Sequence, residues 1–281
     1  MPELTNPRAE RVRAVRALAG RPVRERHHRF LVEGPQPARE AVRHMPRRVE
    51  DLYLTPAAAE RYPEIVAAAR LGDVPVHLAS PEVLDAMSAD AQGVLAVAET
   101  WAATLDATLA RGPRLVAVLA AVRDPGNAGT VIRAADAAGA DAVVLAGQSV
   151  DPFNPKVVRA TAGSLFHLPV VRGTTVADVV GRVRAAGLAV LAADGAGSHD
   201  LDDLLDTLGP PGGAGSPPVS PAVDLRAPTA WVFGNEAWGL LPADRDLADA
   251  VVRVPIRGGA ESLNLATAAA VCLYASARAQ R

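Results

Sequence analysis

Asn127 and Arg133 are the first residues whose types and spacing point to chemistry. They lie between two apolar runs, Leu115 to Val122 and Ala142 to Ala146, in a stretch whose apolar residues recur at helical spacing. This pattern predicts a strand, turn, helix and strand, with Asn127 near the helix start and Arg133 about two turns later. Because open α/β sheets bind ligands at the carboxyl ends of their strands, the two side chains can hold an anionic or hydroxyl-bearing substrate. The alternative is that Asn127 only caps the helix and Arg133 is only solvated.

Three loops at predicted strand ends combine glycine with polar residues: 123–133, 233–240 and 254–266. Gly234 lets a ligand approach the backbone, and Asn235 and Glu236 place hydrogen-bonding side chains beside it. Ser262 and Asn264 flank the start of the last predicted helix, where backbone N–H groups are free. A plain turn at Gly234 and a helix cap at Ser262 are the alternatives for single loops. All three loops together predict a binding pocket at one edge of a sheet.

Strand and helix patterns alternate along the chain, which predicts an α/β fold. The first part contains predicted strands at 30–32, 49–54, 74–78 and 93–98. From residue 114 the predicted strands are more strongly apolar, at 115–122, 142–146, 166–170, 188–193, 229–233 and 251–254. A mostly parallel sheet is expected there, followed by a long helix over 263–278.

Two domains are expected from this alternation. We expect residues 1–105 to form a small α/β domain and residues 113–281 to form a larger one. The stretch 209–221 consists largely of glycine, proline and serine, which is typical of a disordered surface insertion. It lies inside the second domain, because the elements on both sides are needed to complete one sheet.

Charge is distributed unevenly, although the net charge is only −2. Residues 1–50 carry 12 arginines and 6 glutamates, a charge of +6, whereas the rest of the chain carries −8. An arginine-rich end on an acidic chain indicates a phosphate-bearing partner at that end. A helix with a solvated basic face is the alternative.

Several classes of protein are disfavoured by composition. No apolar run reaches the roughly 20 residues of a membrane helix, and the N-terminus lacks an apolar signal core, so a cytoplasmic protein is expected. The single cysteine, Cys272, lies among apolar residues and is expected to be a packed thiol. The six histidines show no metal-ligand spacing, and no metal is expected.

The second domain resembles the SpoU family of RNA ribose 2′-O-methyltransferases, members of the knotted SPOUT superfamily. Its first motif is matched by Asn127, Gly129 and Arg133, and its second by Gly234, Asn235, Glu236, Gly239 and Leu240. The third is matched by Val254-Pro255-Ile256 and Ser262-Leu263-Asn264, and residues 162–170 are similar to a further family segment. In the first domain, residues 30–34 and 91–97 resemble the ends of a ribosomal-protein-like RNA-binding domain.

The resemblance implies methyl transfer from S-adenosylmethionine to a ribose 2′-hydroxyl, a trefoil knot in the chain and a homodimer that completes the site. The expected RNA is 23S ribosomal RNA, with transfer RNA as the second choice. The residues it implies for the cofactor are Ala192, Gly195, Gly234, Asn235, Val254, Ile256 and Leu263.

The same resemblance assigns the chemistry to Arg133, with Asn127, Glu236, Ser262 and Asn264 around it. A guanidinium has a pKa above about 12 and is a poor general base, so we expect Arg133 to anchor the target phosphate and ribose. The rival interpretation makes Arg133 itself the base. Arg24, Arg26 and Arg29, in a predicted basic loop before the first strand, are the expected contacts to RNA phosphates.

Two other classes of protein share part of this pattern. A catalytically silent RNA-binding protein of the same fold is disfavoured because every polar motif residue is present. A dinucleotide-dependent oxidoreductase is disfavoured because residues 194–200 lack the third glycine of a phosphate-binding loop. Trp238 departs from the family pattern; its indole could stack on a base, but packing against a partner subunit is the favoured interpretation.

Overall fold

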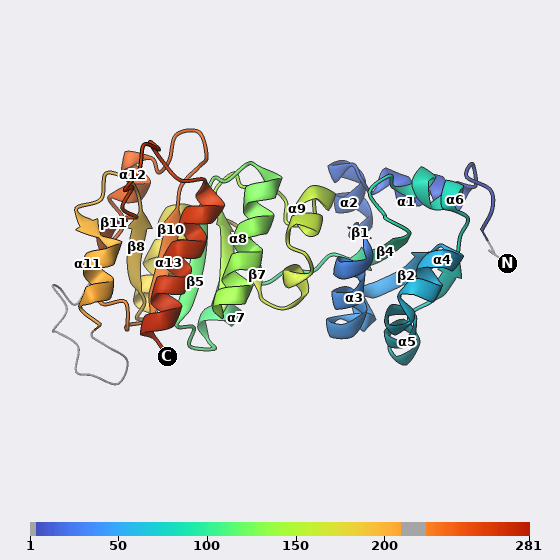
Figure 1. The fold of residues 1–281 in the computed structure, drawn as a ribbon, viewed down its shortest axis with the longest axis horizontal. Helices are drawn as coiled ribbons and strands as arrows, with labels where there is room; N and C mark the ends of the chain where they lie inside the picture. The colour runs from blue at the N-terminus through green and yellow to red at the C-terminus, as the bar shows by residue number, and fades with distance from the viewer. Residues whose placement is uncertain (1–3, 209–222) are drawn as a thin grey trace. The chain divides into compact units, whose positions relative to one another are not determined.

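The computed structural model describes residues 4–208 and 223–281, which form two compact units (Figure 1). The first unit comprises residues up to 101 together with residues 151–167, and the second comprises residues 102–150 and 168–281. The segment 151–167 therefore packs with the first unit, although it lies within the second domain along the chain. The predicted insertion 209–221 falls outside the described residues.

The first unit is built around a four-stranded sheet of order β1-β4-β2-β3. Its strands are β1 (Arg29–Glu33), β2 (Val49–Leu54), β3 (Val76–Leu78) and β4 (Val94–Glu99). The accompanying helices are α1 (Glu10–Ala17), α2 (Arg21–His27), α3 (Pro35–His44), α4 (Pro56–Arg61), α5 (Pro63–Leu71), α6 (Pro81–Met87) and α9 (Pro155–Ala160), with 3-10 turns at η1 (Pro46–Arg48) and η2 (Ser164–Phe166).

An aromatic cluster joins the segment 151–167 to this sheet. Phe30 of β1 lies with its ring centroid 4.8 Å from that of Phe153, and Trp101 lies 5.0 Å from Phe153. Phe166 completes the group, 6.0 Å from Trp101. Such ring contacts add to the apolar burial and hold the two pieces of the unit together.

Arg24 belongs to the interior of the first unit, which corrects its predicted role as an RNA contact. Residues 21–27 form helix α2 and not a loop, and the Arg24 side chain is 3% exposed. Its guanidinium lies 2.9 Å from a carboxylate oxygen of Asp151 and donates to the carbonyls of Leu18 and Ala19. A buried charge is stable only when paired and hydrogen-bonded, as here, so Arg24 is a structural residue.

Glu40, His44 and His167 form a second polar cluster in this unit. Their possible ligand atoms lie within 4.8 Å of one another, and Glu40 Oε2 is 3.3 Å from the Nε2 atom of each imidazole. Glu40 and His44 meet because they are one turn apart on α3. His167 joins them through folding, so no spacing in the sequence could reveal the group.

The second unit contains a seven-stranded sheet of order β7-β6-β5-β10-β8-β11-β9, with every strand pairing parallel. The strands are β5 (Leu115–Ala120), β6 (Ala142–Ala146), β7 (Val170–Thr174), β8 (Ala189–Ala193), β9 (His199–Asp200), β10 (Thr229–Phe233) and β11 (Ala250–Arg253). The helices are α7 (Leu105–Leu109), α8 (Pro125–Ala138), α10 (Val176–Ala185), α11 (Leu201–Asp206), α12 (Pro242–Arg245) and α13 (Leu265–Ala279). The predicted α/β fold with a parallel sheet is confirmed.

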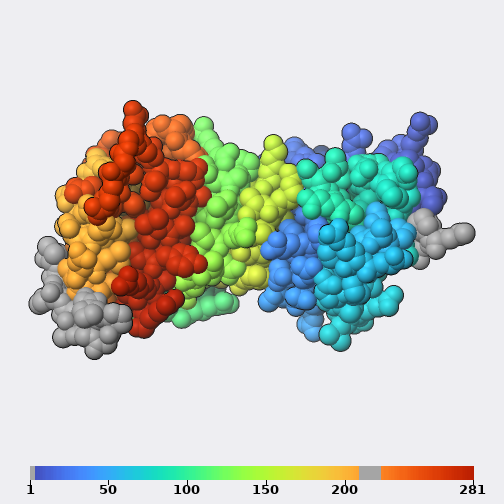
Figure 2. All heavy atoms as spheres, in the orientation of Figure 1, coloured from blue at the N-terminus to red at the C-terminus, as the bar shows by residue number. Residues whose placement is uncertain are grey.

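The central strands β5, β6 and β10 are buried on both faces. Val232 of β10 packs in a cluster with the valines of α10, whereas Trp231 donates its indole N–H to Ser276 of α13 at 2.8 Å. Because successive strand residues point to opposite faces, α10 and α13 must cover different sides of the sheet. Helices α8 and α13 lie side by side over one face (Figure 1), and α13 also forms part of the outer surface (Figure 2).

The strand predicted at 166–170 is wrong: Ser164–Phe166 form a 3-10 turn, and β7 begins at Val170. Pro169, which has no backbone N–H, precedes the strand and contributes only its carbonyl, which accepts from Val143. Among the described residues, no helix has the length and apolar character needed to cross a bilayer.

Candidate active site

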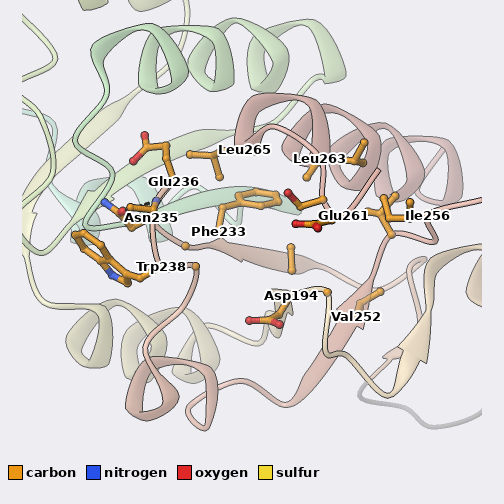
Figure 3. A pocket seen from close by; sticks show the side chains of 18 residues that line it. Asp194, Phe233, Asn235, Glu236, Trp238, Val252, Ile256, Glu261, Leu263 and Leu265 are labelled. Carbon is orange, nitrogen blue, oxygen red and sulfur yellow. Dashed lines mark hydrogen bonds between the residues drawn. The ribbon is translucent and has the colours of Figure 1, made fainter. Parts of the chain in front are cut away.

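A cavity of about 430 Å³ opens at the carboxyl ends of β8, β10 and β11 (Figure 3). Its walls come from three stretches: 193–195, 233–239 and 252–268. Two of these are the glycine-rich polar loops expected from the sequence. A volume of several hundred Å³ is typical of a small-molecule site.

Three side chains from three distant parts of the chain form one hydrogen-bonded array at this edge of the sheet. Asn264 donates through Nδ2 to Asn127 Oδ1 at 2.9 Å, and Asn127 Nδ2 lies 3.4 Å from Glu236 Oε1. Glu236 Oε1 also accepts from the backbone N–H of Asp124 at 3.2 Å. Hydrogen bonds between the three loops therefore hold these side chains in place.

Helix caps explain why these side chains face one another. Asp124 caps α8 by accepting from the N–H of Asn127, with Pro125 in the first helical position. Asn264 caps α13 through Oδ1, which accepts from Ala266 and Thr267, so its amide group is left to reach Asn127. The alternatives that made Asn127 or Ser262 the cap are therefore wrong.

Gly234 and Asn235 shape the second loop. A Cβ at Gly234 would overlap the backbone of Gly239 and Leu240, so only glycine fits there. Asn235 is buried; it donates through Nδ2 to the carbonyl of Ala121 at 2.7 Å and accepts from Ala237 N–H at 2.9 Å. Asn235 lines the cavity and also ties the loop to the end of β5.

Of the residues that the sequence assigned to the cofactor, six line the cavity: Gly195, Gly234, Asn235, Val254, Ile256 and Leu263. Ala192 is instead buried in the core of the unit, and the next two residues, Ala193 and Asp194, line the cavity. Ser262 and Glu236 line it as well.

Several further lining residues were not assigned to the site from the sequence, and the chemically notable ones are Asp194, Phe233 and Glu261. Asp194 directly follows β8, just as Gly234 directly follows β10. A polar residue directly after a predicted buried strand is the sequence feature that could have identified it. Together with Glu236, Asp194 and Glu261 give the cavity three carboxylates (Figure 3).

Arg133 does not line this cavity. It lies on α8, its side chain is exposed, and it makes no hydrogen bond or ion pair with the residues that the structure describes. The structure therefore brings Asn127, Glu236 and Asn264 together but not Arg133.

The remaining arginines predicted to contact RNA lie on the surface of the first unit. Arg26 is exposed at the end of α2, and Arg29 is exposed while paired with Glu50 at 2.6 Å. Of the three predicted contacts, Arg26 and Arg29 are thus accessible and Arg24 is not.

The parallel sheet and its polar cavity define the second unit as an α/β ligand-binding domain with a site at the carboxyl ends of its strands. The chain belongs to the SpoU rRNA Methylase family, whose model matches residues 114–274. A second model, described as RNA 2′-O ribose methyltransferase substrate binding, matches residues 31–100.

Individual relatives agree with this assignment. The chain is 30% identical to the 23S rRNA (guanosine-2′-O-)-methyltransferase RlmB of Bordetella pertussis, over 84% of this chain and 92% of that protein. It is 37% identical to the 23S rRNA (uridine(2479)-2′-O)-methyltransferase of Streptomyces viridochromogenes, over 66% of this chain but only 60% of that protein. The crystal structure of an AdoMet-bound rRNA methyltransferase from Sinorhizobium meliloti is similar with a TM-score of 0.78 and 29% identity, covering 98% of this chain and 97% of that one.

Proposed function

We propose that this protein transfers a methyl group from S-adenosylmethionine to a ribose 2′-hydroxyl of 23S ribosomal RNA. The observation that carries the proposal is the array of Asn264, Asn127 and Glu236, in which all three family motifs meet beside one cavity. The relatives named above, which are 23S rRNA 2′-O-methyltransferases by name, support the same activity.

The chemistry of the cavity fits S-adenosylmethionine. Phe233, Ile256 and Leu263 supply apolar surface for an adenine ring, and the coil around Val254 offers backbone groups to its edge. Asp194, Glu236 and Glu261 suit ribose hydroxyls and the positive charges of a sulfonium and an ammonium group. When bound, this cofactor supplies an activated methyl group, whose bond to sulfur breaks as a bond to the ribose oxygen forms.

The residues of the chain must then align the ribose 2′-hydroxyl with the methyl group and allow its proton to be removed. Arg133 anchors the target phosphate and ribose as a permanent cation, and the phosphate or a water accepts the proton. Asn127, Glu236, Ser262 and Asn264 orient the ribose at the cavity. The rival role for Arg133, as the base itself, would require loss of a proton that a guanidinium holds very tightly.

A homodimer is part of the proposal, because Arg133 lies outside its own cavity. Helix α13, which packs beside α8, exposes apolar groups: Val271 is 40% and Tyr274 50% exposed. Burying such a patch against a second copy is favourable and would bring each Arg133 toward the partner's cavity. The trefoil knot of the superfamily also stays a prediction for this chain.

The first unit is proposed to bind the RNA, through exposed cations such as Arg26 and Arg29 on its surface. The cytoplasm, where ribosomal RNA is found, is the corresponding location. Transfer RNA as the substrate and a silent RNA-binding protein are the outcomes that would replace this proposal.

The test is transfer of a radiolabelled methyl group from S-adenosylmethionine to total RNA from a strain lacking the gene, with 2′-O-methylation mapped afterwards. Label at one ribose of 23S rRNA is expected. Label confined to transfer RNA would change the substrate. Absence of both label and cofactor binding by calorimetry would support the silent RNA-binding protein.

A further inference from the structure

A second, smaller cavity of about 170 Å³ lies beside the first one in the same unit. The two share Trp238 and Gly239 as a common wall. The smaller cavity is also lined by Ala120 and Ala121 at the carboxyl end of β5, and by Gln148 and Asp244. A group bound there would thus be an immediate neighbour of a ligand in the larger cavity.

Trp238 gives this cavity a flat aromatic wall. The indole is 47% exposed, and the guanidinium of Arg123 lies over one face of its ring, 5.3 Å from the centroid. Leu241, 52% exposed, lines the same cavity. A half-exposed indole with an arginine over one face is an arrangement on which nucleic-acid bases stack, the base taking the exposed part of the ring and the cation lying close to a phosphate.

One lining residue, Ala121, is held in an unusual backbone conformation. Ala121 has a φ of 54°, in the left-handed region that alanine avoids, and Asn235 Nδ2 donates to its carbonyl. A non-glycine residue held in this region costs free energy and is found most often where a site needs it. The same Asn235 shapes the larger cavity, so one side chain fixes both sites.

Asp244 makes the cavity selective. Its half-buried carboxylate has no hydrogen-bond donor to its side chain within the parts of the chain that the structure describes. A carboxylate accepts hydrogen bonds and donates none. Guanine offers two adjacent donors, N1–H and the N2 amino group, whereas uracil, adenine and cytosine each present an acceptor beside their only donor group.

We propose that the cavity of Trp238, Arg123 and Asp244 binds the base of the target nucleotide and favours guanine. The base stacks on Trp238, and Arg123 lies where it can meet an adjoining phosphate. Gln148 offers an amide to the base edge. This inference rests on the proposed function, in which the larger cavity binds the cofactor. The smaller cavity is then available for the base of the substrate.

The experiment measures binding of GMP, AMP, UMP and CMP to the full-length protein by saturation-transfer NMR. S-adenosylhomocysteine is present in excess so that nucleotides are kept out of the larger cavity. GMP is expected to bind most tightly. In Trp238→Ala, GMP binding should weaken by about 10-fold or more, whereas Trp238→Phe should retain most of it.

Asp244→Asn is expected to remove most of the preference for GMP, because an amide keeps only one acceptor oxygen and its NH2 group then faces one of the two donors of guanine. Asp246→Asn is the matched control, since Asp246 is exposed and does not line the cavity. Equal GMP binding by the wild type and Trp238→Ala would overturn the site. A preference for GMP that survives undiminished in Asp244→Asn would overturn the guanine assignment.

Binding of S-adenosylhomocysteine, measured separately by calorimetry, distinguishes the two proposals. It should be unchanged in Asp244→Asn. If the wild type failed to bind it, the proposed function would fall, whereas loss of nucleotide selectivity alone would remove only the base site.

Discussion

Asn264 and Asn127, which lie 137 positions apart in the chain, are joined by a hydrogen bond of 2.9 Å from Nδ2 to Oδ1. Asn264 uses its other side-chain atom, Oδ1, to cap α13. The Oδ1 atom of Asn264 therefore has a structural role, and its Nδ2 atom belongs to the site. A substitution that changes only one of the two atoms can separate these roles.

Asn264→Asp is expected to keep the cap and lose the donor to Asn127. The melting temperature should change little, because aspartate caps helices about as well as asparagine. The rate of methyl transfer should fall at least about 10-fold, because the hydrogen bond between residues 264 and 127 is lost. Asn264→Ala is the comparison: it should lose activity and also about 1 kcal/mol of stability. Full activity of Asn264→Asp would show that the link has no role.

Arg133→Ala is expected to bind the cofactor like the wild type but to lose methyl transfer. The reason is that Arg133 lies outside the cavity that would hold the cofactor. Calorimetry with S-adenosylhomocysteine and a methyl-transfer assay measure the two properties. Mixing this variant with Asn127→Ala should restore part of the activity if sites are completed across a dimer. Wild-type turnover by Arg133→Ala would contradict the role assigned to it.

Arg24→Ala is expected to destabilise the first unit by about 3–5 kcal/mol, because it removes the cation of a buried ion pair and leaves the charge of Asp151 uncompensated by Arg24. Urea unfolding measures the change. Arg26→Ala is the control from the same helix: its side chain is exposed, so stability should stay within about 0.5 kcal/mol. A stable Arg24→Ala protein with weakened RNA binding would support the original prediction instead.

Stability should decline at alkaline pH. Burial raises the pKa of the Cys272 thiol from 9.0 to about 12, and burial together with Asp51 raises the pKa of Tyr53 from 10.0 to about 12. In the unfolded chain these groups ionise first, so the stabilisation is complete below pH 9.0 and is lost as the pH rises toward 12. Urea unfolding across this range should show a smaller pH dependence in Cys272→Ala. Cys272 should also resist thiol reagents until the protein unfolds.

Chelation is expected to leave methyl transfer unchanged, because the proposed chemistry needs only an activated methyl group and an aligned hydroxyl. Treatment with EDTA followed by the methyl-transfer assay tests this. Glu40, His44 and His167 are the described group that could hold an ion. If chelation abolished activity, and zinc restored it in the wild type but not in His44→Ala, the reaction would need a metal held by this group.

The sequence predicted the parts of the site that depend on local pattern. Polar loops after buried strands are visible because burial and turn chemistry leave a signature within a few residues, as at Gly234 and Glu236. The cap positions were less accessible: Asp124, Asn127, Ser262 and Asn264 are all acceptable caps, and only the backbone decides among them.

Contacts between distant residues account for what was missed. The local sequence predicts a surface cation at Arg24, because its partner, Asp151, comes 127 positions later. The place of Asn235 against Ala121 likewise depends on β10 lying next to β5, which no local pattern reveals.

The position of β10 also bears on how the protein is made. This strand, Thr229–Phe233, lies between β5 and β8 and is hydrogen-bonded to both, although they precede it by many residues. During synthesis, the ladder of β5, β6 and β7 therefore emerges long before the strand that must join it to β8. Until β10 arrives, β5 presents an unpaired apolar edge, which is a hazard for association between nascent chains. Folding of this unit should therefore be slow and should wait for β10, since its central pairings are among the least local of the described strands.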